Sequence, residues 1–234
     1  MGVGYGNVFK KIVTNGLVFC VDAGNSGSYP GSGTTWRDLS GNSLNGTLSS
    51  TTFSSSNGGT LVFDGANSIS DHGTSSVLDL TTSLTLDVWF YPTGWGEGDR
   101  GRLVDRNYPT GLSYALFLTP PTDANPNGVS YFTNGNLAGQ SLFLSNCVTL
   151  NAWHNFVITH TGGTAIMYKN GSQIHSGACT QPSSSSTNFV LGNRLTLLDR
   201  TFAGSIPSFK AYNRALTAAE VTQNFNALRG RYGI

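Results

Sequence analysis

The stretch that most constrains the fold is residues 153–171, which predicts three short strands that fold back on one another. It is rich in β-branched and aromatic residues, as strands are. Gly162-Gly163 can adopt the positive φ angles that a tight reversal needs. Asn170-Gly171 is a strong hairpin signal, because both central positions of a type I′ turn need positive φ. Such a meander cannot bury its apolar face alone, so it needs a second sheet over it.

The composition is typical of many short strands joined by turns. Charged residues make up 11% of the 234 residues, against about 25% in an average globular chain. The chain has 30 glycines, while 13 Phe, 9 Tyr and 4 Trp supply core material, which excludes a disordered chain. With a net charge of +1, nothing attracts the chain to nucleic acid or to a membrane, and we expect neither partner.

Residues 84–91 and the C-terminal segment extend this picture. In residues 84–91 apolar and other side chains alternate, so Asp87, Trp89 and Tyr91 share one face of a strand. Residues 35–39 favour a helical turn around a tryptophan. The C-terminal segment predicts a helix that begins with a capping box of Thr217 and Glu220. Its apolar stripe is Val221, Phe225 and Leu228, and we expect it to stop at Gly230.

Together these patterns predict an all-β protein: a two-sheet antiparallel jelly-roll sandwich with one short C-terminal helix. We expect residues 1–15 to form an N-terminal arm and residues 16–234 to form a single domain. The start of the chain lacks the apolar region of a signal peptide, and no apolar run reaches the roughly 18–20 residues of a membrane span. We therefore expect synthesis in a cytoplasm.

The acidic residues are too few to favour an enzyme that cleaves sugars. Retaining glycosidases need two carboxylates about 5 Å apart. The only glutamates are Glu97, in a loop, and Glu220, which the helix cap explains. His154 and His160 share a strand face but would lie about 20 Å apart, too far to bind one zinc ion. We expect no catalytic residues.

Four phrases resemble a known family. They are FDG at 63–65, LTLDVWFYPT at 84–93, the meander at 153–171 and residues 202–221, and they are similar to laminin-G-like, concanavalin A-like lectin/glucanase jelly-roll domains. The opening, residues 11–48, resembles virion structural proteins of tailed bacteriophages, of the cyanophage type. Where relatives often have Gly-x-Ile-Asp, this chain has Pro207 in place of the aspartate, which suggests an edge or bulged position.

What the resemblance implies is a non-catalytic virion component: a capsid decoration, head-fibre or tail-appendage subunit. Its partners would be other virion subunits, with the chain as a homo-oligomer located in the virion. The alternative is a carbohydrate-binding adhesin that recognises host surface glycans. The candidate ligand residues, which packing or subunit contact would equally explain, are Trp95, Asn107 and Tyr108 from one loop region, and Asp87, Trp89 and Tyr91 from one strand face.

We expect no cofactor unless calcium binds. The resemblance implies calcium held by loop oxygens, which suit a hard cation. The candidates, which otherwise are turn residues, are Asp22, Asp64, Asp71 and Asp199. The three cysteines are expected to be reduced and packed, with a bridge between Cys147 and Cys179 as the alternative.

Overall fold

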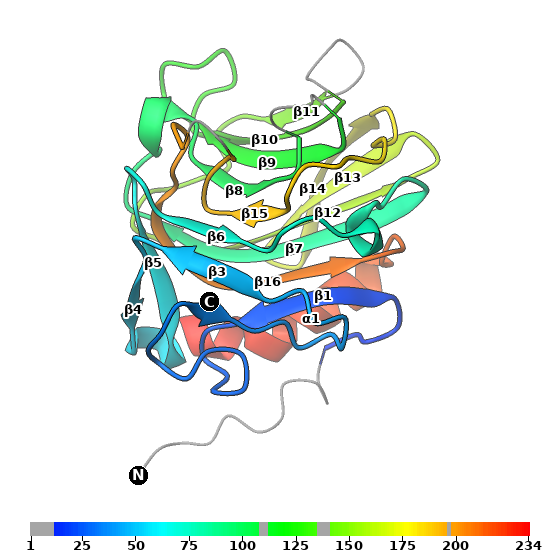
Figure 1. Cartoon of the computed structure of the whole chain (residues 1–234). Helices are drawn as coiled ribbons and strands as arrows, with labels where there is room; N and C mark the ends of the chain where they lie inside the picture. The colour runs from blue at the N-terminus through cyan, green and yellow to red at the C-terminus, as the bar shows by residue number, and fades with distance from the viewer. Residues whose placement is uncertain (1–11, 108–111, 135–140, 196–197) are drawn as a thin grey trace.

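The computed structural model describes residues 12–107, 112–134, 141–195 and 198–234, and in them two antiparallel sheets lie face to face (Figure 1). The first sheet contains, in spatial order, β14 (Ser172–Ala178), β13 (Thr164–Lys169), β12 (His154–Thr161), β7 (Ser83–Pro92), β16 (Ala203–Tyr212), β5 (Thr60–Asp64) and β4 (Thr52–Ser54), with β1 (Leu17–Asp22) paired to the second half of β16. The second sheet contains β11 (Ser141–Leu144), β10 (Gly128–Thr133), β9 (Tyr114–Thr119), β8 (Arg102–Asp105), β15 (Val190–Leu191), β6 (Ile69–Asp71), β3 (Gly46–Ser49) and β2 (Thr35–Trp36). The predicted two-sheet sandwich is confirmed.

The predicted meander is the edge of the first sheet. β12, β13 and β14 pair in sequence, and the two turns between them have the positive φ angles that the glycines and Asn170 permit. β7 lies beside β12, and its alternation holds: Leu86, Val88 and Phe90 are buried between the sheets. The alternation of side chains along the strand therefore determines which residues of β7 face the core between the sheets.

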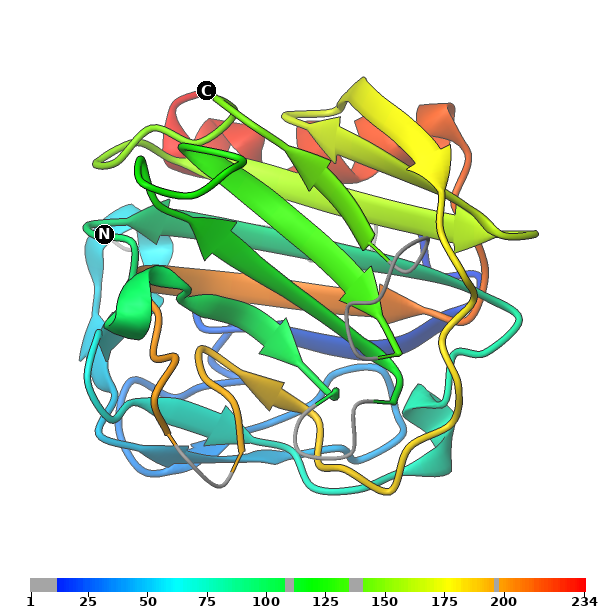
Figure 2. The same ribbon diagram turned by 90° about the horizontal axis from the view of Figure 1, so that it is seen from above.

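The short helical turns are η2 (Ser56–Gly58), η3 (Ser76–Leu78) and η4 (Glu97–Asp99), and the one α-helix in the described residues is α1 (Ala218–Tyr232). α1 lies across the outer face of the first sheet, as Figures 1 and 2 both show in red. Trp89 on β7 stacks against Phe225 and Tyr232 of α1, with ring centroids 5.6 and 4.3 Å apart. None of the helices in the described parts combines the length and apolarity needed to cross a bilayer.

The helix begins as predicted and ends later. Thr217 and Glu220 form the capping box, each side chain bonded to the other residue's backbone N–H. The predicted stop at Gly230 is wrong, because α1 continues to Tyr232 and Gly233 takes the left-handed φ of +71°. The last turn is retained because Tyr232 packs on Trp89.

Residues 35–39 do not form the predicted helical turn. Thr35 and Trp36 instead pair with Thr47 and Gly46 as β2 and β3. Gly46 is needed there because a β-carbon would overlap the ring of His72. Burial of the Trp36 side chain in the main core, which the local pattern does not reveal, favours the strand.

The end of the expected N-terminal arm contacts the folded domain. Residues 1–11 lie outside the described residues, but Ile12 and Val13 are buried. The Val13 N–H donates to Asn224 Oδ1 of α1 at 2.8 Å, and the Tyr212 hydroxyl donates to the Val13 carbonyl at 3.0 Å. Ile12 and Val13, which fall within the expected arm of residues 1–15, therefore pack against the sandwich.

Candidate functional site

Three loops converge at one end of the sandwich, on the left side of Figure 2. They connect β7 to β8, β9 to β10, and β11 to β12. Backbone hydrogen bonds join them: the Val148 N–H donates to the Asn127 carbonyl at 2.9 Å, and the Asn151 N–H donates to the Pro92 carbonyl at 2.7 Å. Side chains from distant parts of the sequence therefore meet on a fixed frame.

A groove of about 430 Å³ lies among these loops, within the roughly 300–1,000 Å³ that ligand pockets occupy. Its lining combines an indole, two amides, a hydroxyl and apolar side chains, from Trp95, Pro121, Asn127, Asn146, Val148, Thr149 and Leu150. Trp95 is half-buried and packs against the main core. We call this hollow the Trp95 groove.

The two amides of the Trp95 groove belong to asparagines in tight turns. Asn127 and Asn146 have φ values of +51° and +54°, a left-handed conformation that asparagine tolerates better than most residues. Their side chains are near each other, with Nδ2 of Asn127 3.5 Å from Oδ1 of Asn146. The two amides thus lie side by side at the surface of the groove, where a ligand can reach both.

A second hollow of about 320 Å³ adjoins the first across Pro120 and Pro121. It is lined by Asp99, Arg100, Pro120, Thr122, Asp123 and Ala124, and we call it the Arg100 hollow. Nη2 of Arg100 donates to Oδ2 of Asp123 at 2.7 Å. The Arg100 side chain is 45% exposed, whereas that of Asp123 is 9% exposed, so the guanidinium is the more accessible partner.

Of the residues predicted to bind glycan, the structure places Trp95 in this groove. Asp87 and Trp89 do share the outer face of β7, but α1 covers them, and they are 1% and 0% exposed. The expectation that they face a ligand is therefore contradicted: Asp87 accepts from Asn155 and Asn224 and lies 3.4 Å from Nζ of Lys210. The sequence period identifies the face but not what packs on it.

Of the other three glycan candidates, the structure describes two, and neither lines the Trp95 groove. Tyr91 is half-buried, with its ring centroid 5.2 Å from that of Trp153. Asn107 is buried and follows the C-terminal end of β8, whereas Trp95 precedes the N-terminal end of that strand. Trp95 and Asn107 therefore do not share one loop. Tyr108 lies outside the described residues.

Sequence reasoning missed the two amides of the Trp95 groove, Asn127 and Asn146. Asn127 ends a segment rich in proline and asparagine, which was an available turn signal, whereas Asn146 follows β11 almost directly and has no such signal. The convergence of the three loops could not be predicted from local sequence, because the convergence depends on pairing between strands that are far apart in the chain.

The four calcium candidates are not brought together. Each has a partner of its own: Asp22 with Arg231 (2.6 Å), Asp64 with three backbone N–H groups, Asp71 with Asn188 (3.0 Å) and Asp199 with Arg194 (2.5 Å). Partial burial raises the pKa of Asp64, but the N–H groups outweigh it and hold the pKa at about 2. Across the described ranges no three acidic, histidine or cysteine side chains lie close enough to bind a metal ion.

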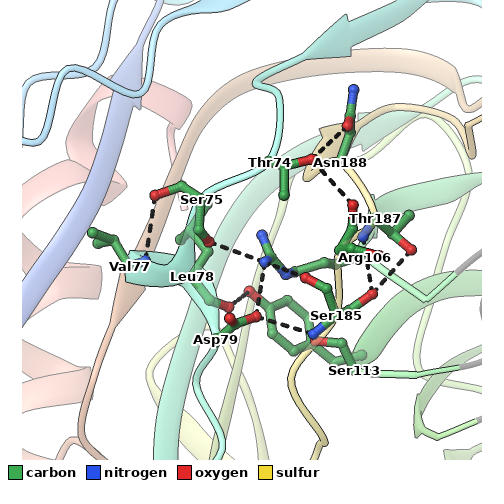
Figure 3. A network of polar contacts seen from close by, with 12 residues as sticks. Thr74, Ser75, Val77, Leu78, Asp79, Arg106, Ser113, Ser185, Thr187 and Asn188 are labelled. Carbon is green, nitrogen blue, oxygen red and sulfur yellow. Dashed lines mark hydrogen bonds and ion pairs between the residues drawn. The ribbon is translucent and has the colours of Figure 1, made fainter.

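A polar cluster around Arg106, at the other end of β8, ties further loops together (Figure 3). Nη2 of this buried arginine donates to the Ser75 carbonyl, to Oδ1 of Asp79 and to the Ser185 carbonyl, at 2.9, 2.8 and 2.8 Å. These acceptors belong to the loop before β7 and the loop before β15. Because the contacts are internal, we interpret the cluster as a structural clamp.

Comparisons with known proteins agree with this architecture. A family model described as the concanavalin A-like lectin/glucanases superfamily matches residues 63–222. No curated protein matches the chain. The structure is similar to the binding domain of Paraclostridial mosquitocidal protein 1, with a TM-score of 0.69 and 16% identity over 92% of this chain and 52% of that one.

Two further structures share the fold. Domain 4 of an extracellular arabinanase from Geobacillus stearothermophilus, solved in complex with arabinotriose, has a TM-score of 0.66 and 17% identity over 89% of this chain and 97% of that one. The botulinum neurotoxin serotype D binding domain has a TM-score of 0.66 and 11% identity over 92% of this chain and 52% of that one. The chain thus spans about half the length of the two toxin structures.

Proposed function

The chain belongs to the concanavalin A-like lectin/glucanases superfamily, and from this we propose that it is a carbohydrate-binding module whose ligand occupies the Trp95 groove. The observation that carries the proposal is the meeting of a half-buried indole with two neighbouring amides in an open groove. The arabinanase domain solved with arabinotriose supports a sugar as the class of ligand.

The lining chemistry suits a sugar. A sugar ring has an apolar face of C–H groups and a rim of hydroxyls. An indole supplies a flat, rigid apolar surface. Each asparagine amide supplies both donors and an acceptor, which match hydroxyl groups that themselves donate and accept. Trp95 would stack on the ring, and Asn127, Asn146 and Thr149 would orient it.

We propose that the module binds without catalysis. Oε2 of Glu97 accepts a hydrogen bond from the Thr201 hydroxyl at 3.1 Å. Glu220 caps α1 and pairs with Arg214 at 2.6 Å. Both glutamates thus have structural partners, and incubation with polysaccharide should release no reducing ends.

Display on a virion stays a prediction of the sequence resemblance. The structures named above are two toxin binding domains and an arabinanase domain, and they do not bear on it. A glycan-binding module on a phage particle would contact host surface glycans. Detection of the chain in purified particles, together with its oligomeric state there, would test this role and the expected virion partners.

The test of carbohydrate binding is the variant Trp95→Ala on a glycan array, followed by calorimetry with the sugars that bind. Loss of the stacking surface should weaken binding at least about tenfold, equivalent to ~1.4 kcal/mol. Phe53→Ala is the control, because Phe53 is also a partly buried aromatic packed on the core but does not line the groove. A silent array at high protein concentration, or unchanged affinity in Trp95→Ala, would contradict the proposal.

A further inference from the structure

We infer, resting on the proposed function, that the Arg100 hollow is a second subsite for the same ligand, so that the module takes a neutral oligosaccharide chain rather than a single sugar or an acidic polysaccharide. The claim concerns residues that do not line the Trp95 groove: Asp99, Arg100, Thr122 and Asp123. It follows from the position, the charge and the rigidity of the hollow.

The position makes the two hollows neighbours. One is lined by Pro120 and the other by Pro121, so consecutive residues of a single loop separate them. The Gly101 N–H donates to the Trp95 carbonyl at 2.8 Å, which also holds the Arg100 segment against the Trp95 segment. A ligand that is longer than one ring in the Trp95 groove can therefore extend into the Arg100 hollow.

The charge of the lining favours neutral sugars. The hollow presents two carboxylates, Asp99 and Asp123, and one guanidinium, Arg100. A sugar with its own carboxylate would meet more negative than positive charge there. The neighbouring Arg102 is paired with Asp105 at 3.0 Å, and Asp199 is shared by Arg194 at 2.5 Å and Arg200 at 3.6 Å, so these cations have acidic partners outside the hollow. Neutral hydroxyls can instead accept from Arg100 and donate to the carboxylates.

The rigidity comes from an internal network. Oδ2 of Asp123 accepts from Arg100, while Oδ1 accepts from the Asn125 N–H at 2.9 Å. The guanidinium of Arg100 also lies 5.9 Å from the centre of the Phe117 ring. Arg100 is thus held at one side and exposed at the other, so ordering it for a ligand costs little entropy.

The test is calorimetry with sugars of increasing length: the mono-, di- and trisaccharides of arabinose, xylose, glucose and galactose, and the trisaccharide of galacturonic acid. The wild-type protein should bind its best neutral trisaccharide roughly tenfold more tightly than the monosaccharide. Arg100→Gln should abolish most of that gain and leave monosaccharide affinity unchanged. Arg37→Gln, which removes an exposed arginine elsewhere, should change neither affinity.

The outcomes separate the two claims. Equal affinity for one and three units, or tighter binding of the galacturonate trisaccharide than of the galactose one, would overturn the inference and leave the Trp95 groove as a single-sugar site. A length-dependent gain that Arg100→Gln leaves intact would also overturn it. If none of the sugars binds at any length, the proposed function itself fails, and the inference with it.

Discussion

At the scale of the residue, buried polar groups hold the loops of this sandwich. Arg106 is fully buried, and its Nη2 donates to acceptors in two other loops. Removing a buried cation leaves its acceptors unsatisfied, a cost that exceeds the net contribution of the hydrogen bonds. Burial likewise makes it costly to protonate a histidine that is neutral in the folded protein.

Arg106→Leu should destabilise the protein by about 2–3 kcal/mol, less than the roughly 3–5 kcal/mol cost of breaking a fully buried pair, because Asp79 is 24% exposed. Urea unfolding measures the change in free energy of unfolding. Arg37→Leu is the matched control, since Arg37 is exposed. Equal stabilities of the two variants would show that the clamp contributes nothing.

Stability should fall as the pH drops from about 6.5 to about 4. Burial lowers the pKa of His72 from 6.5 to about 4, and burial also lowers the pKa values of His154 and His160. In that window the unfolded state binds protons that the folded state excludes, so each unit of pH costs up to about 1.4 kcal/mol for His72 alone.

The measurement is the urea midpoint at pH 7, 6, 5 and 4. His72→Gln should flatten the dependence, although the other two histidines will leave some slope. Its neutral side chain can still donate to the Leu44 carbonyl, as Nδ1 of His72 does at 2.8 Å. A slope identical to that of the wild type would argue that His72 is protonated in the folded state.

At the scale of the element, α1 is the part whose docking decides what the outer face of the first sheet can do. Its apolar stripe covers Trp89, and its Asn224 donates to Asp87 at 3.2 Å and to the Tyr212 hydroxyl at 2.9 Å. Packing of α1 therefore buries the outer face of β7 in a second hydrophobic cluster. We therefore propose sugar binding at the loop end of the sandwich and not on this covered face.

Thr217→Ala should lower stability by about 1 kcal/mol, because the N-cap hydroxyl accepts from the Glu220 N–H. Thr217→Ser keeps that hydroxyl and should remain within about 0.5 kcal/mol of the wild type. Thermal and urea unfolding of the two variants give the comparison. If Ser and Ala were equally destabilising, the cap would not be the cause.

At the scale of the whole molecule, the sandwich is stabilised by its core and not by covalent cross-links. Cys20, Cys147 and Cys179 are free and buried, so the alternative of a bridge between the last two is not what the structure shows. Burial raises the pKa of the Cys20 thiol to about 12 and that of Cys147 to about 11. Such thiols are poor nucleophiles at neutral pH.

A thiol reagent should therefore label the native protein slowly and should label three cysteines after unfolding in denaturant. The melting temperature should be the same with and without reductant. A mass lower by two hydrogens without reductant, or a melting temperature that falls when reductant is added, would contradict the free-thiol state.

Features that depend on local geometry can be predicted from the amino-acid sequence. Alternation along residues 84–91 decided which side chains of β7 form the core, Asn170-Gly171 decided one hairpin, and Thr217 with Glu220 decided where α1 begins. Each is readable because a strand repeats every two residues and because turns and caps have strict φ or hydrogen-bond requirements.

Features that depend on long-range packing became visible in the folded chain. Docking of α1 removed Asp87 and Trp89 from the ligand candidates, and it carried the helix past Gly230. Convergence of three loops brought Asn127 and Asn146 to Trp95. The physical reason is that burial and cavity shape arise from contacts between segments far apart in the chain, which a local pattern does not encode.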